Sequence, residues 1–282
     1  MATVLKKPTQ VGGSLATTSI LYKIKAILAG VFTLWFKHIY KFTHSSMEIV
    51  GTLGIPLLWM FLFGVCMDAT LHQITGTGIG YKAYITPGVM FLTALTAAVM
   101  SGSTLLTERL NGVVKEYLVA PVPRIAVLFG TISSGLTKTV LQALIVLGLG
   151  ALLDNALILE VGSLLAGLAI VVVYSLGFVG IAAAFACKAQ EMEGYHSIIM
   201  LINLPVFFAS NALYPLSKLP AALRMLAYLN PTTYAVDASR HLFYGVPTEI
   251  GLWLDISVLL IFALASLGYA YFTFGRLHIW AK

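Results

Sequence analysis

The sequence predicts an all-α polytopic membrane protein: six transmembrane helices, an N-terminal interfacial amphipathic helix, and an outer re-entrant helical hairpin before the last span. Three observations lead to this fold class. The chain has 282 residues, of which 59% are hydrophobic and only 10% charged, and its mean hydropathy is +0.92. Soluble domains contain about 25% charged residues. Long apolar runs recur along the chain, and a cluster of lysines precedes the first of them.

The N-terminal region differs from the rest of the chain. Residues 1–19 are rich in Thr, Gly and Ser, which predicts a flexible tail. Residues 20–45 have apolar side chains at helical spacing and lysines on another face, and their uncharged stretch is too short to span a bilayer. We therefore expect a helix in the inner headgroup layer, with its lysines toward anionic lipid; a half-inserted span is the alternative. The apolar positions are Leu21, Ile24, Leu28, Val31 and Trp35.

Residues 46–282 are predicted to form one transmembrane domain, because a spanning helix needs about 20 mostly apolar residues. The runs of this kind are, approximately, 49–67, 83–107, 125–153, 161–187, 194–217 and 256–275. With the N-terminus inside, twelve Lys and Arg residues fall in cytoplasmic segments and four in outer ones, Lys138 aside. The positive-inside rule thus predicts a multi-pass protein of the plasma (inner) membrane with both termini cytoplasmic. Topology accounts for the basic residues, so no nucleic-acid partner is expected.

The longest outer segment, 218–249, contains two short amphipathic stretches separated at Asn230-Pro231. Proline cannot continue the first helix, and the preceding Asn favours a turn. Two amphipathic helices joined by a turn predict a hairpin that dips into the outer leaflet.

Polar residues within the apolar runs are candidates for a transport pathway. Lys138 lies on a stripe with Thr131, Ser134 and Gln142, which indicates either a hydrophilic conduit wall or a lysine snorkelling to the inner surface. Asn203 and Asn211 flank aromatic residues near Pro205. Their amides either line a transport pathway or make ordinary helix-packing contacts. No nucleophile, metal or phosphate-loop motif is found, so the chain is predicted to be non-catalytic and to bind no cofactor itself.

The segment 108–120 carries charged residues between the second and third spans. Its apolar residues recur at helical spacing on one face, and Pro121 and Pro123 end the helix. A short amphipathic helix facing the cytoplasm fits the groove of a protein partner, and a helix resting on lipid is the alternative. The apolar positions are Leu110, Val113, Val114, Tyr117 and Leu118.

Two stretches have the character of family motifs: ERLNGVVKEYLVAPVPRIAVLFG at 108–130, and 204–245, which includes Asn-Pro-x-Thr-Tyr-x-x-Asp-x-x-Arg. In both stretches the chain resembles the type-2 ABC exporter permease family of drug-, lipid- and polysaccharide-exporting subunits. The similarity covers nearly everything after residue 20.

The resemblance implies a homodimer that pairs with two copies of a cytoplasmic ATPase, which binds ATP and Mg. It implies that the helix at 108–120 couples the ATPase to the permease, that the hairpin forms an outer gate, and that spans one, two and five line the conduit. The implied ATPase-coupling residues are Glu108, Arg109, Asn111, Gly112, Lys115, Glu116, Tyr117, Glu191 and Glu193. The implied gate residues are Asn230, Pro231, Tyr234, Asp237 and Arg240. The candidate pathway residues are Trp59, Phe63, Met90, Asn203, Phe207, Asn211 and Lys138.

The sequence therefore predicts the permease subunit of an ATP-driven exporter. Its expected substrate is amphipathic: a drug, a lipid or a lipid-linked glycan. The alternative is an ion- or proton-coupled carrier or channel, which would need buried acidic residues within the spans.

Overall fold

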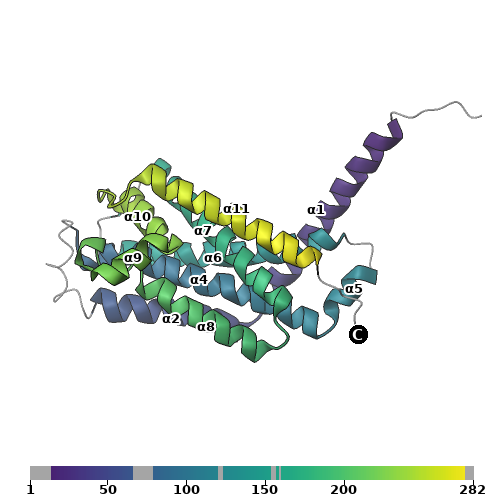
Figure 1. The fold of residues 1–282 in the computed structure, drawn as a ribbon, viewed down its shortest axis with the longest axis horizontal. Coiled ribbons are helices and arrows are strands. Elements are labelled where there is room, and N and C mark those ends of the chain that lie inside the picture. The colour runs from purple at the N-terminus through teal and green to yellow at the C-terminus, as the bar shows by residue number, and fades with distance from the viewer. Residues whose placement is uncertain (1–13, 66–78, 120–122, 154–156, 159, 277–282) are drawn as a thin grey trace, which may run out of the picture.

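A computed structural model describes residues 14–65, 79–119, 123–153, 157–158 and 160–276 of the chain, and every regular element in these ranges is helical. Most helices lie side by side in one elongated bundle, and the N-terminal part of α1 extends beyond it (Figure 1). The elements are α1 (Ser14–Thr43), α2 (Ser46–Trp59), the π-helix η1 (Met60–Val65), α4 (Tyr81–Leu110), α5 (Val113–Val119), α6 (Arg124–Leu153), α7 (Val161–Lys188), α8 (Met192–Phe208), the 3₁₀ turn η2 (Leu216–Lys218), α9 (Ala221–Leu229), α10 (Pro231–Tyr244) and α11 (Leu252–Gly275).

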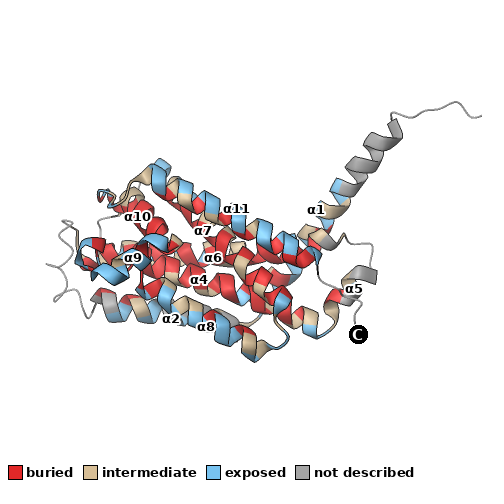
Figure 2. Ribbon diagram, viewed as in Figure 1, coloured by how far each residue is buried: buried red, intermediate tan, exposed pale blue. Residues whose placement is uncertain are grey.

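The centre of the bundle is α4, which packs against α6, α7, α8 and α10, while α7 also packs against α11. Figure 2 shows α4 mostly buried and the outward side of α11 exposed. Small residues allow this close packing: at Gly102, an added Cβ would collide with the Tyr195 hydroxyl and the backbone of Ala182. The bundle has two ends, which we call the α5 end (residues 108–119 and 187–193) and the α10 end (79–84 and 209–251).

Four helices in the described part of the chain are long and apolar enough to cross a membrane, by length and composition: Tyr81–Leu110, Ile125–Leu153, Val161–Lys188 and Leu252–Gly275. Each coincides with a predicted span. The predicted first span falls on α2 and η1 and runs into residues outside the described ranges. The predicted fifth span, 194–217, is helical only to Phe208. The count of six spans stays a prediction.

The face of α1 that packs against the bundle coincides only in part with the predicted apolar one: Val31 and Trp35 are half-buried, and Trp35 donates to Thr137 of α6. The residues buried are Gly30, Leu34, His38 and Phe42, four apart, whereas Ile24 and Leu28 are exposed. An added Cβ at Gly130 of α6 would lie 2.7 Å from Leu34 Cβ, so the two helices approach closely there. Periodicity identifies an apolar stripe but not whether protein or lipid covers it. The interfacial position of 20–45 stays a prediction. Of the predicted tail 1–19, residues 1–13 lie outside the described residues, and α1 begins at Ser14.

Several Ser and Thr hydroxyl groups within α4 and α6 are satisfied locally, which makes them compatible with an apolar surrounding. In α4, Thr86, Thr93 and Ser101 donate to carbonyls three or four residues earlier. In α6, Thr131 donates to the carbonyl of Val127 in the same way.

We expect Gly88→Ala to destabilise the fold, because its new Cβ would lie 2.5 Å from the backbone oxygen of Ala212. Overpacking of this kind costs about 1–3 kcal/mol. Gly148→Ala is the matched control, since nothing lies within 4 Å of a Cβ there. Thermal unfolding of the purified protein in detergent measures both, and equal melting temperatures would contradict the close approach.

Candidate functional site

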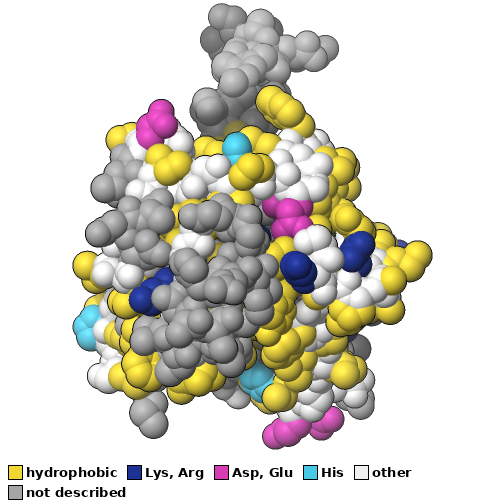
Figure 3. Space-filling model, turned by 90° about the vertical axis from the view of Figure 1, so that its left-hand side faces the viewer, with side chains coloured by type: hydrophobic (Ala, Val, Ile, Leu, Met, Phe, Trp, Pro, Cys, Tyr) yellow, Lys and Arg dark blue, Asp and Glu magenta, His cyan; other side chains and the backbone are white. Residues whose placement is uncertain are grey.

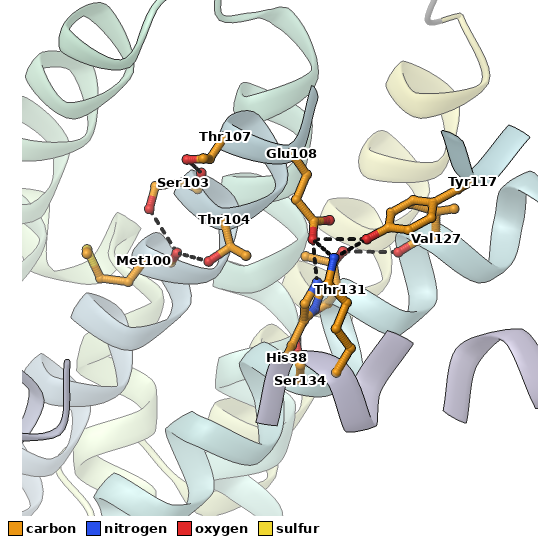
Figure 4. A network of polar contacts seen from close by, with 11 residues as sticks. His38, Met100, Ser103, Thr104, Thr107, Glu108, Tyr117, Val127, Thr131 and Ser134 are labelled. Carbon is orange, nitrogen blue, oxygen red and sulfur yellow. Dashed lines mark hydrogen bonds and ion pairs between the residues drawn. The ribbon is translucent and has the colours of Figure 1, made fainter. Parts of the chain in front are cut away.

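At the α5 end, one carboxylate oxygen joins three helices. Glu108 Oε1, near the end of α4, accepts hydrogen bonds from Lys37 Nζ at 2.7 Å and from His38 Nε2 at 3.1 Å, both on α1. It also accepts one from the Tyr117 hydroxyl of α5, at 3.1 Å (Figure 4). His38 Nδ1 lies 3.1 Å from Ser134 Oγ, which adds α6 to the network. The position of α5 is therefore tied to α1, α4 and α6 at a single point.

The electrostatics of this network favour a charged pair. Burial disfavours the ammonium of Lys37, but its hydrogen bonds to Glu108 and Tyr117 outweigh burial and raise the pKa of Lys37 above its ordinary value of 10.5. Lys37, predicted to face anionic lipid, instead pairs with Glu108.

The predicted single helix 108–120 is two elements. The spanning helix α4 continues to Leu110, and Gly112 has a φ of 78°, a left-handed conformation that glycine adopts without strain. The short helix α5 then begins at Val113. Glu108 and Arg109 thus belong to the end of α4, where Arg109 donates to the carbonyl of Cys187 at the end of α7.

Burial divides the predicted coupling residues into two groups. Glu108 is buried, and Arg109 and Tyr117 are half-buried, so these side chains hold the α5 end together. The side chain of Lys115 lies outside the described residues. The exposed ones, available to a partner, are Asn111, Glu116, Glu191 and Glu193.

At the α10 end, Asn230 joins two helix termini. Its Nδ2 donates to the carbonyls of Val206 and Ala209 (2.9 Å to the latter), where α8 ends. Its Oδ1 accepts from the amide of Thr232 at 3.0 Å, which caps α10, with Pro231 in the first turn. One amide side chain thus satisfies backbone groups that two interrupted helices leave unpaired.

The other predicted gate residues also bind backbone. Asp237 accepts from the amides of Glu249 and Ile250, at 3.1 and 3.0 Å, and so fixes the segment that leads into α11. Arg240 donates to the carbonyls of Tyr84 (3.3 Å) and Asn211 (3.0 Å). The Tyr234 hydroxyl donates to the carbonyl of Tyr228 of α9 at 2.6 Å.

The predicted pathway residues do not form one cluster. Trp59 and Phe207 meet edge to face with centroids 5.4 Å apart. Met90 is buried in the core, Asn203 is half-buried, and Asn211 is fully buried beside Arg240. The Phe63 side chain lies outside the described residues.

Lys138 lies apart from them, 4.7 Å from the centre of the Phe42 ring of α1. With His38, Lys41, Ser101, Thr104 and Ser134 it lines a cavity of only about 30 Å³. Its polar stripe is covered by α1 and α4 within the chain.

Three residues that the sequence reasoning missed are prominent in the structure. The role of His38 depends on a partner 70 residues away, which no local pattern reveals. Tyr84 places its ring 3.7 Å from the Arg240 guanidinium. Asp255 is 0% exposed in the first turn of α11, and neither carboxylate oxygen has a hydrogen-bond partner among the described residues. The acid within the apolar stretch LWLDIS was the available signal for it.

Comparison with known proteins identifies the family of this chain. The family model of the ABC-2 type transporter matches residues 29–244, which is most of the chain and includes both ends of the bundle. The chain belongs to the ABC-2 type transporter family. This confirms the family that the two sequence stretches predicted.

Relatives of this ABC-2 permease are similar over most of their length. A putative transport permease ycf38 of Pyropia yezoensis is 28% identical over 81% of this chain and 76% of its own. The daunorubicin resistance ABC transporter permease protein DrrB1 of Streptomyces coeruleorubidus is 25% identical over 86% and 85%. The inner membrane transport permease YadH of Escherichia coli K12 is 23% identical over 83% and 90%.

The protein is thus a transmembrane subunit of an ABC transporter and a multi-pass membrane protein. Its relatives are named as permeases, consistent with the expected non-catalytic role. Members of this family normally work with a cytoplasmic ATPase.

We expect Glu108→Gln to lower the stability of this permease by about 1–3 kcal/mol, because the amide keeps the shape but loses the charge that Lys37 binds. Glu116→Gln is the control, because Glu116 is exposed on α5 and such surface changes stay within about 0.5 kcal/mol. Thermal unfolding in detergent compares them. Equal stability of the two variants would show that Glu108 does not hold the α5 end.

We expect Asn230→Ala to be more destabilising, by about 2–4 kcal/mol, because it removes the α10 cap and also leaves the carbonyls of Val206 and Ala209 without their donor. Asn203→Ala on α8 is the control, since Asn203 is half-buried and is not one of the residues that Asn230 binds. The measurement is again the melting temperature. A loss no larger than that of the control would contradict the double role of Asn230.

Proposed function

We propose that this chain is the permease subunit of an ATP-driven exporter, which works as a homodimer with two copies of a cytoplasmic ATPase. The ATPase binds ATP and Mg, and the permease moves an amphipathic drug, lipid or lipid-linked glycan from the cytoplasm or inner leaflet outward. With the α5 end in the cytoplasm, as the positive-inside rule predicts, both termini lie on that side.

The observation that carries the proposal is the construction of the α5 end. A short helix with an exposed charge, Glu116, is anchored through Tyr117 to a buried carboxylate at the end of the central helix α4. Glu191 and Glu193, between α7 and α8, supply a second exposed acidic segment, and Arg109 ties α4 to the end of α7. A partner that pushes on α5 therefore acts directly on α4. Such a partner shifts the permease between states only by binding them unequally.

Glu108 has a different role from the one the family resemblance implied. Since its carboxylate is buried and bonded within the chain, we infer that it positions α5 and that the exposed residues contact the ATPase.

The substrate class is supported by composition and by one relative. The long described helices are apolar and carry few charged residues within their length, which suits a hydrophobic or amphipathic molecule. The name of DrrB1 links that relative to daunorubicin resistance, which is in keeping with export of an amphipathic drug.

Asp255 favours the second candidate, an ion- or proton-coupled carrier, because such carriers place acids inside the membrane. Reconstitution separates the two. Uptake in vesicles that contain the permease alone and a pH or sodium gradient would support the carrier, whereas transport that needs the ATPase and ATP supports the exporter.

We expect Glu116→Lys to leave the melting temperature unchanged but to reduce substrate-stimulated ATP hydrolysis of the assembled complex by about tenfold, as the loss of one charged contact of about 1.4 kcal/mol would. Glu160→Lys is the control: it is the same charge reversal at an exposed site before α7. Full stimulation in both Glu116→Lys and the double variant Glu191→Lys/Glu193→Lys would refute the α5 end as the ATPase contact.

A further inference from the structure

The α10 end contains a cavity of about 440 Å³, a size typical of small-molecule sites. It is lined by the start of α4, the segment around η2, helices α9 and α10, and the segment 246–249. Figure 3 looks at this end and shows basic and acidic side chains close together in a largely hydrophobic surface. The charged side chains that line the cavity are Arg224, Asp237, Arg240 and Glu249.

Among the described residues, Arg240 is a buried cation with no ion-pair partner within 4.0 Å. The residue is 2% exposed, and within the described part of the chain the ion pairs closer than 4.0 Å involve Glu108 alone. Arg240 Nε and Nη2 donate to carbonyls, but Nη1 has no hydrogen-bond partner among the described residues. A buried charge is costly unless it is paired and fully hydrogen-bonded, so this guanidinium is incomplete as it stands.

Two further donors that line the same cavity are also unused. Arg224 Nη2 donates to the carbonyls of Ser217 and Leu219, at 3.1 and 3.0 Å, which fixes the guanidinium, but its Nε has no partner in the described residues. The Tyr84 hydroxyl, also buried, likewise has none there. Three residues that line this cavity, on α4, α9 and α10, thus each carry a buried donor atom with no acceptor among the described residues.

The acids of the cavity are already engaged. Both oxygens of Asp237 accept backbone amides, and Glu249 Oε2 accepts the amide of Leu216 at 2.8 Å. Burial raises the pKa of Glu249, and the nearby Arg240 guanidinium opposes this effect. The unsatisfied groups at the cavity are thus donors, two of them on cations.

We propose that this cavity is a binding site for an oxyanion, a phosphate or carboxylate group held by Arg240 and Arg224 with the Tyr84 hydroxyl. Guanidinium groups suit such anions because their planar donors match two oxygens at once. Two sources share this chemistry: the head group of an amphiphile and a free anion from solution. The site goes beyond the proposed function, since binding needs neither an ATPase nor transport; a head group would give the exported molecule its polar end.

The test uses the full chain, purified in nanodiscs of phosphatidylcholine, and measures binding by calorimetry at constant ionic strength. The probes are inorganic phosphate and a short-chain phosphatidic acid, with a short-chain phosphatidylcholine as the zwitterionic reference. We expect at least one anionic probe to bind saturably and more tightly than the reference. Binding of the lipid alone assigns the site to a head group, and binding of phosphate as well assigns it to the anion itself.

Three variants decide whether the binding occurs in this cavity. We expect Arg224→Gln to weaken binding about tenfold. Lys218→Gln is the matched control, because it removes the same charge from the neighbouring segment but lines a different, apolar groove; we expect less than about a twofold change there, as for a screened surface charge. Glu249→Gln removes a negative charge from the cavity and is expected to strengthen binding.

If Arg224→Gln weakens anion binding and Glu249→Gln strengthens it, at unchanged melting temperatures, a purely structural role of these two residues cannot account for the result. Arg240→Lys keeps the charge but loses the planar donors that also hold the carbonyls of Tyr84 and Asn211, so we expect it to weaken binding and to lower the melting temperature. The decision therefore rests on Arg224→Gln. The proposal is overturned if neither anionic probe binds the wild-type protein, or if Arg224→Gln and Lys218→Gln weaken binding equally. Because the binding experiment uses neither ATP nor the ATPase, its result neither supports nor contradicts the exporter hypothesis, which the reconstitution experiment tests separately.

Discussion

Interrupted helices in an apolar bundle depend on side chains that satisfy their free backbone groups, and the α10 end depends on this constraint throughout. The helix α8 stops at Phe208. There, Asn230 donates hydrogen bonds to the carbonyls of Val206 and Ala209, and its side-chain oxygen caps α10. Asp237 and Arg240 then bind the backbone of the segments on either side. The polar residues of the stretch 204–245 therefore have a structural role: their side chains bind backbone groups. Any motion of this end has to break these hydrogen bonds and form others.

The α5 end is built on the opposite principle, with one buried carboxylate in place of several backbone bonds. Glu108 gathers donors from α1 and α5, so the N-terminal helix is part of the same unit as the proposed ATPase contact. If the ATPase binds α5 as proposed, a force on α5 would be shared by α1 and α4 through these hydrogen bonds.

Much of the architecture could be predicted because long apolar runs report directly on spanning helices. The runs 125–153 and 161–187 correspond closely to Arg124–Leu153 and Val161–Lys188. Two kinds of information were missing. Local pattern could not show that one glycine, Gly112, ends α4 and starts a new helix, nor could it pair His38 with Glu108 from 70 residues away. The roles of the coupling residues came from resemblance, and burial then separated anchors such as Glu108 from exposed contacts such as Glu116.

The central helix connects the two ends. Tyr84 and Glu108 both lie on α4, about 36 Å apart at 1.5 Å per residue. Near Tyr84, Pro87 removes a hydrogen bond of the helix, which loosens that turn, and Arg240 donates to the Tyr84 carbonyl there. Gly88 lets the backbone of Ala212 approach the same turn. A displacement of α4 at the α5 end would therefore be transmitted to the turn around Pro87, where the helix lacks a backbone hydrogen bond and Arg240 binds the Tyr84 carbonyl. Coupling between distant sites requires an element whose two arrangements both sites bias. Within the described part of the chain, α4 with its proline turn is one element that reaches both ends.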